Sequence, residues 1–113
     1  QINHRAKQII LQNIMSNVSE SSVIITNPTH ISVALRYKQG KDSAPRLVAK
    51  GINHMAYRIK EIAQENNVPI VEDKYLARFI YKNVELEEEI PQEIYKAVAD
   101  ILTYIFKLNN KRL

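Results

Sequence analysis

The 113-residue chain has the size of one globular domain, with 45% hydrophobic and 25% charged residues. It contains no Cys, which excludes disulfides, zinc ribbons and thiol catalysis within it, and its 2 Gly and 4 Pro argue against Gly-rich nucleotide loops. No apolar run approaches the ~18 residues that a membrane-spanning helix needs. The chain begins at Gln1 without a leader, so we expect it to be a piece of a longer protein.

The net charge of +4 is distributed unevenly. Residues 1–50 carry seven Lys or Arg and two acidic residues, whereas residues 51–113 carry nine Lys or Arg and ten acidic residues. A basic half fits nucleic acid, an anionic membrane surface or an acidic partner as well as simple solubility. One function therefore stays open on charge alone: a basic module that binds nucleic acid or a membrane surface.

A helix is predicted near the start of the chain, because apolar residues recur at a spacing that suits one helical stripe: Ile2, Ala6, Ile9, Ile10, Ile14 and Met15. This stripe either packs on the domain or continues a helix from an upstream segment. Residues 19–22 are polar and predict a connector.

Two strands joined by a tight turn are predicted next. The β-branched run 23–26 is typical of a buried strand, and residues 31–38 alternate between apolar and polar side chains, as in a strand with one buried face. Between them, Pro28 cannot donate a ladder hydrogen bond and biases Asn27 away from the helical conformation. We expect this turn at one end of a sheet.

A strand–helix–strand unit follows a polar loop. The third strand, 47–50, is expected to end at Gly51, and Asn53 is expected to cap a helix with the apolar face Met55, Ile59, Ile62 and Ala63. A fourth strand at 68–71 completes a right-handed unit with parallel pairing.

The last third of the chain is predicted to be helical. Asp73 caps a short helix whose inward residues are Leu76, Ala77, Phe79 and Ile80. After a charged loop at 85–89, Pro91 opens the final helix, whose buried residues are Ile94, Val98, Ile101, Leu102, Ile105 and Leu108. The fold class is therefore α/β: a small four-stranded mixed sheet flanked by about four helices.

The segment Asn27-Pro28-Thr29-His30 carries the most specific chemistry. Asn normally deamidates when the nitrogen of the next residue attacks its side chain, but Pro28 has no N–H and blocks that route. The reverse attack stays open. The Asn27 side-chain nitrogen can attack its own main-chain carbonyl, close a succinimide and expel the Pro28 nitrogen, which breaks the chain between residues 27 and 28.

A constrained turn supplies enough acceleration for this reaction. If the free bond breaks at ~10⁻⁸ s⁻¹ and the folded one at ~10⁻³ s⁻¹, the barriers differ by roughly 7 kcal/mol. Holding an intramolecular nucleophile in place contributes about 7–11 kcal/mol. His30 is expected to accept a proton or polarise the carbonyl, and Thr29 to hydrogen bond the turn. The alternative is an unreactive Asn-Pro turn.

This motif extends on both sides, since residues 23–37 read Val-Ile-Ile-Thr-Asn-Pro-Thr-His-Ile-Ser-Val-Ala-Leu-Arg-Tyr. That stretch closely resembles the core of the type III secretion export-switch family. The likeness continues through residues 44–51, 66–72, 76–78 and 89–99 and covers essentially all of residues 5–108. The Ala-Pro-Arg-Leu-Val-Ala-Lys-Gly segment at 44–51 resembles the flagellar branch in particular.

The resemblance implies a cytoplasmic domain of an integral protein of the bacterial inner membrane. Residues 1–22 are then the linker helix and connector from an absent membrane domain, and residues 23–113 are a switch domain that cleaves itself between Asn27 and Pro28. Each molecule reacts once, so it is not a turnover enzyme. The expected role is to gate flagellar protein export and to change its substrate class.

The partners implied by the resemblance are other flagellar export-gate proteins, a hook-length ruler protein, and exported rod, hook and filament subunits. No nucleic acid, metal or cofactor is expected, and the membrane is reached only through the absent N-terminal domain. The 8 aromatic residues are expected mostly on core faces, which leaves no stacking platform for RNA.

The resemblance also implies an apolar patch that binds export substrates, at Ala44, Pro45, Ala99 and Leu102. Ala44 and Pro45 fall in a predicted loop, where apolar side chains are accessible to a partner. Leu102 belongs to the buried stripe of the final helix, for which core packing is the alternative role.

Overall fold

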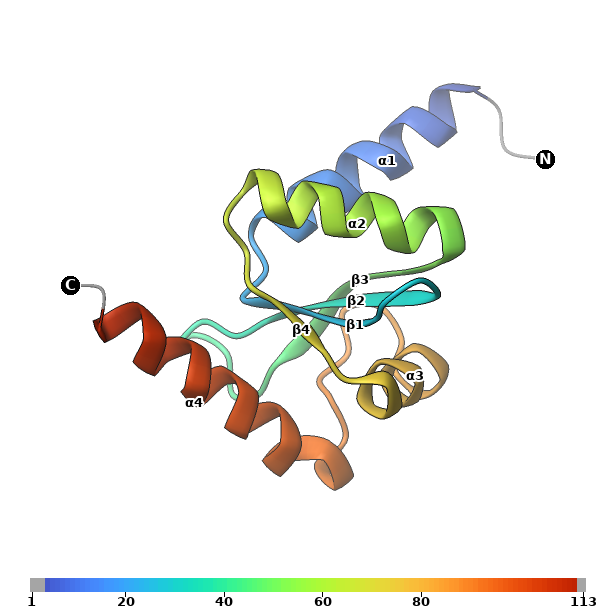
Figure 1. The fold of residues 1–113 in the computed structure, drawn as a ribbon. Helices are drawn as coiled ribbons and strands as arrows, with labels where there is room; N and C mark the ends of the chain where they lie inside the picture. The colour runs from blue at the N-terminus through green and yellow to red at the C-terminus, as the bar shows by residue number, and fades with distance from the viewer. Residues whose placement is uncertain (1–3, 112–113) are drawn as a thin grey trace.

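The computed structural model describes residues 4–111 as three layers with a central sheet (Figure 1). Its elements in chain order are α1 (His4–Ser19), β1 (Val23–Asn27), β2 (Ile31–Arg36), β3 (Arg46–Ile52), α2 (Asn53–Glu65), β4 (Ile70–Glu72), α3 (Lys74–Asn83), the 3₁₀ turn η1 (Gln92–Ile94) and α4 (Tyr95–Lys111). Within residues 4–111, no helix combines the length and the apolar character needed to cross a bilayer. The predicted fold class, α/β with a four-stranded mixed sheet and four α-helices, is confirmed.

The sheet has the strand order β3-β2-β1-β4. β1 pairs antiparallel with β2, β2 pairs antiparallel with β3, and β1 pairs parallel with β4. All five residues of β1 are buried. β1 is therefore a central strand with a neighbour on each side, and its last residue is Asn27.

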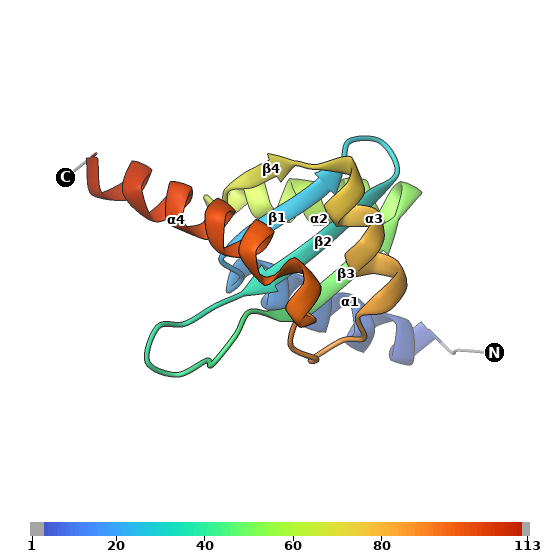
Figure 2. The same cartoon turned by 90° about the horizontal axis from the view of Figure 1, so that it is seen from below.

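Helices cover both faces of the sheet, α1 and α2 on one side and α3 and α4 on the other (Figures 1 and 2). Alternate strand residues face the two layers, as a period of two requires. The α2 side of the core contains Val18, Ile24, Ala34, Val48, Ala49, Ile59, Ile62, Ala63 and Val68. The α4 side contains Val23, Ile25, Val33, Leu35, Leu47, Leu76, Ala77, Ile80, Val84, Ile90, Ile94, Val98, Leu102 and Ile105.

Two predictions around α2 are wrong in detail. β4 pairs with β1, whereas the strand–helix–strand pattern had suggested pairing with β3, which lies at the opposite edge of the sheet. Asn53 does not cap α2: its φ is 51°, the cap position is Ile52, and no side-chain cap hydrogen bond forms there. The Asn53 main-chain N–H instead donates to the His30 carbonyl at 2.9 Å.

The helix termini also differ from expectation. Pro91 is extended (ψ 155°) and precedes the 3₁₀ turn rather than opening α4 itself. Leu108, expected in the core, is 42% exposed, since it lies near the end of α4, where that helix extends past the sheet (Figure 2). The Asp73 cap of α3 is confirmed by its hydrogen bond from the Leu76 N–H at 3.0 Å.

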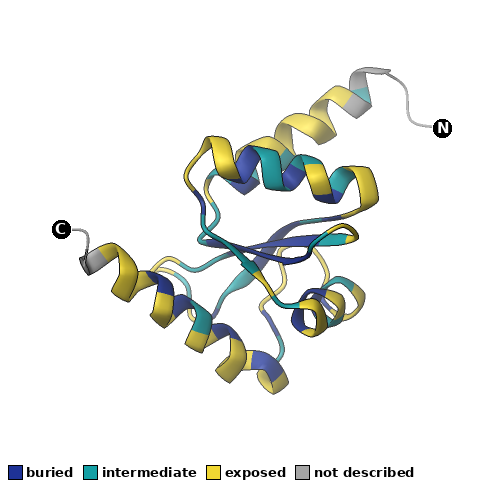
Figure 3. Cartoon of the chain, viewed as in Figure 1, coloured by how far each residue is buried: buried dark blue, intermediate teal, exposed yellow. Residues whose placement is uncertain are grey.

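The apolar stripe of α1 mostly does not pack on the domain. Ile9, Ile10 and Met15 are 43–52% exposed, and Ile2 lies outside the described residues. The C-terminal part of α1 meets the body, where Val18 is fully buried and Ile14 packs against the α2 side of the core, while the N-terminal part extends away (Figures 1 and 3). The predicted helix is present, and its assignment as a linker stays a prediction.

Gly51 was expected to end the third strand but lies inside β3. A Cβ atom at this position would come within 2.5 Å of the Met55 Cγ and 2.8 Å of the Met55 Cβ. Glycine thus allows the start of α2 to fold back tightly against β3.

Replacing Gly51 with Ala should therefore destabilise the domain by about 1–3 kcal/mol, because Met55 and the first turn of α2 must shift. Chemical denaturation followed by circular dichroism measures the change. An unchanged unfolding midpoint would show that the β3–α2 junction is looser than these contacts indicate.

Candidate functional site

The turn between β1 and β2 is closed by one short main-chain hydrogen bond. The His30 N–H donates to the Asn27 carbonyl oxygen at 2.9 Å, which makes residues 27–30 a β-turn with Pro28 at its second position. The fixed φ of proline suits that position, and its missing N–H costs the sheet no ladder bond. The carbonyl that joins Asn27 to Pro28 is thus held and polarised.

Hydrogen bonds below the turn fix both strands that carry it. The Thr26 hydroxyl donates to the Ile31 carbonyl at 2.9 Å, and the buried Ser32 hydroxyl donates to the Ala56 carbonyl of α2 at 3.0 Å. The Asp73 N–H donates to the Thr26 carbonyl at 3.0 Å from the β4 side. The turn therefore projects from a rigid base.

Asn27 is 7% exposed, yet its side-chain amide forms no hydrogen bond within residues 4–111. An amide nitrogen with no partner is available to react with a nearby electrophile. The carbonyl carbon of the same residue is that electrophile, and His30 N–H withdraws electron density from it.

The four predicted cleavage residues are thus together in one turn, but they contribute differently from expectation. Thr29 and His30 are exposed, and among the described residues neither side chain makes a hydrogen bond or ion pair. The group of His30 that contacts the Asn27 carbonyl is its main-chain N–H. Roles for the imidazole and for the Thr29 hydroxyl stay predictions.

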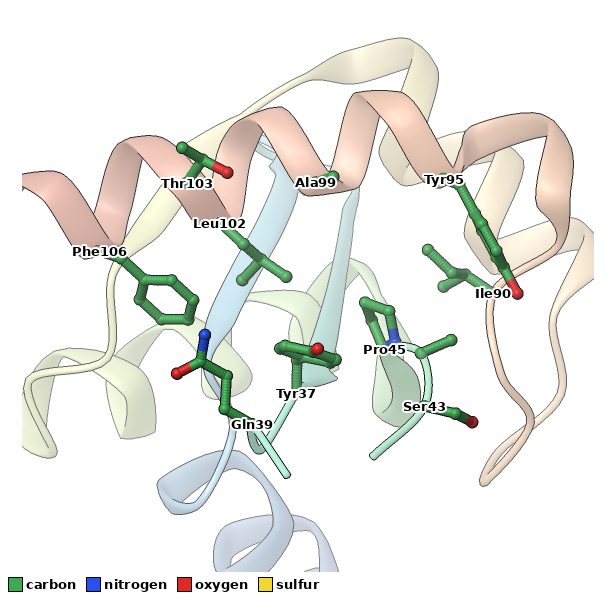
Figure 4. A pocket seen from close by; sticks show the side chains of 11 residues that line it. Tyr37, Gln39, Ser43, Pro45, Ile90, Tyr95, Ala99, Leu102, Thr103 and Phe106 are labelled. Atoms are coloured by element: carbon green, nitrogen blue, oxygen red, sulfur yellow. The ribbon is translucent and has the colours of Figure 1, made fainter. Parts of the chain in front are cut away.

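A second feature is an open pocket of about 300 Å³ between α4 and the segment that follows β2 (Figure 4). It brings together all four residues predicted for the apolar patch, and it adds others that the sequence reasoning missed. The lining residues are Tyr37, Gln39, Ser43, Ala44, Pro45, Ile90, Tyr95, Ala99, Leu102, Thr103 and Phe106. The prediction that they bind a substrate is not tested by this geometry.

Ala44 and Pro45 were expected to be accessible to a partner. This prediction is wrong for Ala44, which is only 5% exposed. Residues 44–46 are held against the loop before α4. The Ile90 N–H donates to the Pro45 carbonyl at 2.9 Å, and the main chains of Arg46 and Glu89 form a single antiparallel β-bridge. Leu102 is also 5% exposed and serves both core and pocket. Ala99 is the exposed member.

The loop before the patch is folded around Asp42. Its carboxylate accepts hydrogen bonds from the Lys38 main-chain N–H at 2.8 Å and from the Arg36 Nε and Nη2 at 3.3 and 3.2 Å. The Lys38 N–H, and after it the Arg36 guanidinium, lower the pKa of Asp42 below its usual value. This bonding sets the path of the chain into Ser43 and Ala44.

The comparisons with known proteins decide the family. A family model described as the FlhB HrpN YscU SpaS family matches residues 1–105. The chain belongs to this family. Two relatives named flagellar biosynthetic protein FlhB are 42% identical over 110 residues (Bacillus subtilis) and 46% identical over 102 residues (Escherichia coli).

Those matches cover 97% and 90% of the chain but only 31% and 27% of the two relatives, so the chain spans between a quarter and a third of their length. Among solved structures, the cytoplasmic domain of FlhB from Shewanella putrefaciens is similar with a TM-score of 0.83, 37% identity, and coverage of 89% of this chain and 78% of that one. A mutated EscU C-terminal domain gives a TM-score of 0.82 at 30% identity, covering 92% and 94%.

The aromatic side chains of this chain are more exposed than the sequence predicted. The aromatic residues were expected mostly on core faces, yet five of the eight are at least 37% exposed: Tyr57, Tyr75, Tyr95, Tyr104 and Phe106. They are spread over α2, α3 and α4, because each helix has one packed face and one open face. The expectation of no nucleic-acid partner stays a prediction.

The Asp42 loop predicts an acid-dependent stability. Because the folded pKa is lowered, the carboxylate stabilises the fold above the unfolded pKa of about 4, and this contribution is lost as the pH falls through the folded pKa. The difference in melting temperature between the wild type and Asp42→Asn should therefore be largest above about pH 4 and shrink below it. Thermal melts at neutral and acidic pH measure this difference. If the melting temperatures of the wild type and Asp42→Asn differ by the same amount at both, the ionised Asp42 carboxylate does not stabilise the loop.

Proposed function

We propose that the chain is the export-switch domain of a flagellar type III secretion apparatus and that it cleaves itself between Asn27 and Pro28. The observation that carries the proposal is the closed turn, in which the main-chain carbonyl of Asn27 is hydrogen bonded while its side-chain amide has no hydrogen bond among residues 4–111. Membership of the FlhB HrpN YscU SpaS family supports the export role. Each molecule reacts once, so the domain is a switch and not a turnover enzyme.

In the whole protein, residues 1–22 are the linker from a membrane domain, and residues 23–113 are the switch at the cytoplasmic face of the bacterial inner membrane. The partners are other flagellar export-gate proteins, a hook-length ruler protein, and exported rod, hook and filament subunits. The relatives named flagellar biosynthetic protein FlhB, of which the matched segment is only 31% and 27%, support this placement.

The reaction needs only atoms of the chain and solvent protons. The Asn27 Nδ2 attacks the Asn27 carbonyl carbon, a C–N bond forms, and the carbonyl electron pair moves onto the oxygen that His30 N–H contacts. When the carbonyl re-forms, the bond to the Pro28 nitrogen breaks. One proton leaves Nδ2 and one is taken up by the Pro28 nitrogen, which gives a succinimide and a new N-terminus.

Cleavage should depend on Asn27 and on the fold. Mass spectrometry of the purified wild type should find a break between residues 27 and 28, Asn27→Ala should stay intact, and Asn27→Asp should be much slower, since a carboxylate is a poorer nucleophile here. Pro28→Ala should also slow cleavage, because it relaxes the turn and reopens deamidation. The wild type held in denaturant should not cleave.

A break at the same bond in Asn27→Ala would contradict the succinimide mechanism. A single intact wild-type chain with salt-sensitive binding to DNA or anionic vesicles would instead favour the basic binding module.

After cleavage, the two fragments should co-elute in native gel filtration. β1 stays hydrogen bonded to β2 and β4, and its buried Val23, Ile24 and Ile25 each contribute about 1.5–3 kcal/mol.

We also propose that the pocket at α4 binds exported subunits. Its lining combines apolar and aromatic side chains that remain partly accessible, among them Tyr95, Ala99 and Phe106. Such a surface suits an apolar segment of a partner. Because Ala44 is buried, a charge there would unfold the site, so the test belongs at exposed Ala99.

Ala99→Lys should weaken binding of exported subunits at least tenfold, or about 1.4 kcal/mol, because it places an ammonium in the apolar pocket. The melting temperature should barely change, since Ala99 is exposed on a helix. Ala97→Lys, two residues away on α4 and outside the pocket, is the matched control. Isothermal titration with a purified subunit measures both, and equal affinities would remove the pocket from the proposal.

A further inference from the structure

A side chain from α2 reaches into the Asn27–His30 turn. The Lys60 Nζ donates a hydrogen bond to the Pro28 carbonyl oxygen at 3.1 Å, across 32 residues of sequence. We propose that Lys60 is a positioning residue for self-cleavage, which it promotes by holding this carbonyl. The inference deepens the proposed function and depends on it.

The contact controls the one main-chain torsion that Pro28 leaves free. The ring fixes φ of Pro28, and the peptide bond on each side is planar, so ψ is the remaining variable. A hydrogen bond to the Pro28 carbonyl oxygen fixes ψ. Together with the His30 N–H on the Asn27 carbonyl, it holds both carbonyls that flank the leaving nitrogen.

Lys60 is itself held in a defined place. Its neighbour Ile59 is fully buried against the sheet, and Ala56, one turn earlier, accepts the Ser32 hydroxyl from below the same turn. The Lys60 side chain is half-buried, which limits the conformations its ammonium samples. α2 thus presents a cation to the turn from a fixed support.

The charge of Lys60 acts in the same direction as its geometry. Attack on the Asn27 carbonyl carbon places negative charge on the carbonyl oxygen, while the starting amide is neutral. A cation bound to the adjacent peptide unit favours the charged state over the neutral one, and it needs no rearrangement during the reaction. Lys60 touches neither bond that forms or breaks, so its effect passes through the Pro28 carbonyl.

The test uses the full chain made by cell-free synthesis with a short labelling pulse. Samples taken at intervals after the pulse are run on denaturing gels, which give the rate at which the intact chain is cleaved. Lys60→Met keeps the length and loses the charge and donor, and it should cleave at least tenfold more slowly than the wild type. Lys60→Arg keeps a cation and a donor and should restore most of the rate. Arg58→Met is the matched control, since Arg58 lies on α2 but pairs with Glu61 at 3.3 Å.

Melting temperatures of Lys60→Met and Lys60→Arg, each carrying Asn27→Ala to prevent cleavage, separate positioning from stability. If Lys60→Met cleaves as fast as the wild type, the role of Lys60 is overturned and the proposed function still stands. Equal slowing in both Lys60 variants with a fall in melting temperature would also overturn it, as a purely structural effect. No break in the wild type would overturn the proposed function, and this inference with it.

Discussion

The hydrogen bonds on both sides of β1 determine what its last residue can do. β2 and β4 hold the strand laterally, and the Asp73 N–H binds the Thr26 carbonyl one residue before Asn27. Asn27 is therefore positioned by the sheet, although it begins a turn. A reacting group at a strand end is held more closely than one in a free loop, and intramolecular reactions gain most from such restraint.

The turn and the pocket lie at opposite ends of β2. Ile31 follows the turn, whereas Tyr37, Gln39 and the segment 43–45 follow the end of the strand at Arg36 (Figure 2). Six strand residues span about 20 Å. A break at Pro28 thus leaves every lining residue of the pocket covalently attached to β2. Any effect of cleavage on the pocket must pass through the sheet or through a partner that contacts both ends.

Much of this fold could be predicted, because local patterns encode it. A run of β-branched residues predicted β1, alternation predicted β2, and Asp73 at the start of an apolar helix predicted the cap of α3. Two of the errors originate in long-range contacts, since the partner of β4 and the exposure of Leu108 depend on where distant elements pack. The error at Gly51 is local: Met55 is only four residues away, and it approaches because α2 folds back directly after β3. At the site, the turn at Asn27–Pro28 was predictable from local residues, whereas the Lys60 contact across 32 residues was not.

The proposed cleavage uses Asn27 and Pro28, which relate differently to the local structure. Asn is disfavoured in strands, yet here it ends a fully buried one. Proline removes a donor, but at the second position of the turn no donor is needed. Ala at 27 would suit the strand better, and most residues at 28 would complete the turn. The turn therefore accounts for Pro28, whereas Asn27 is the residue that the strand alone does not favour, so Asn27→Ala separates the proposed reactivity from the fold.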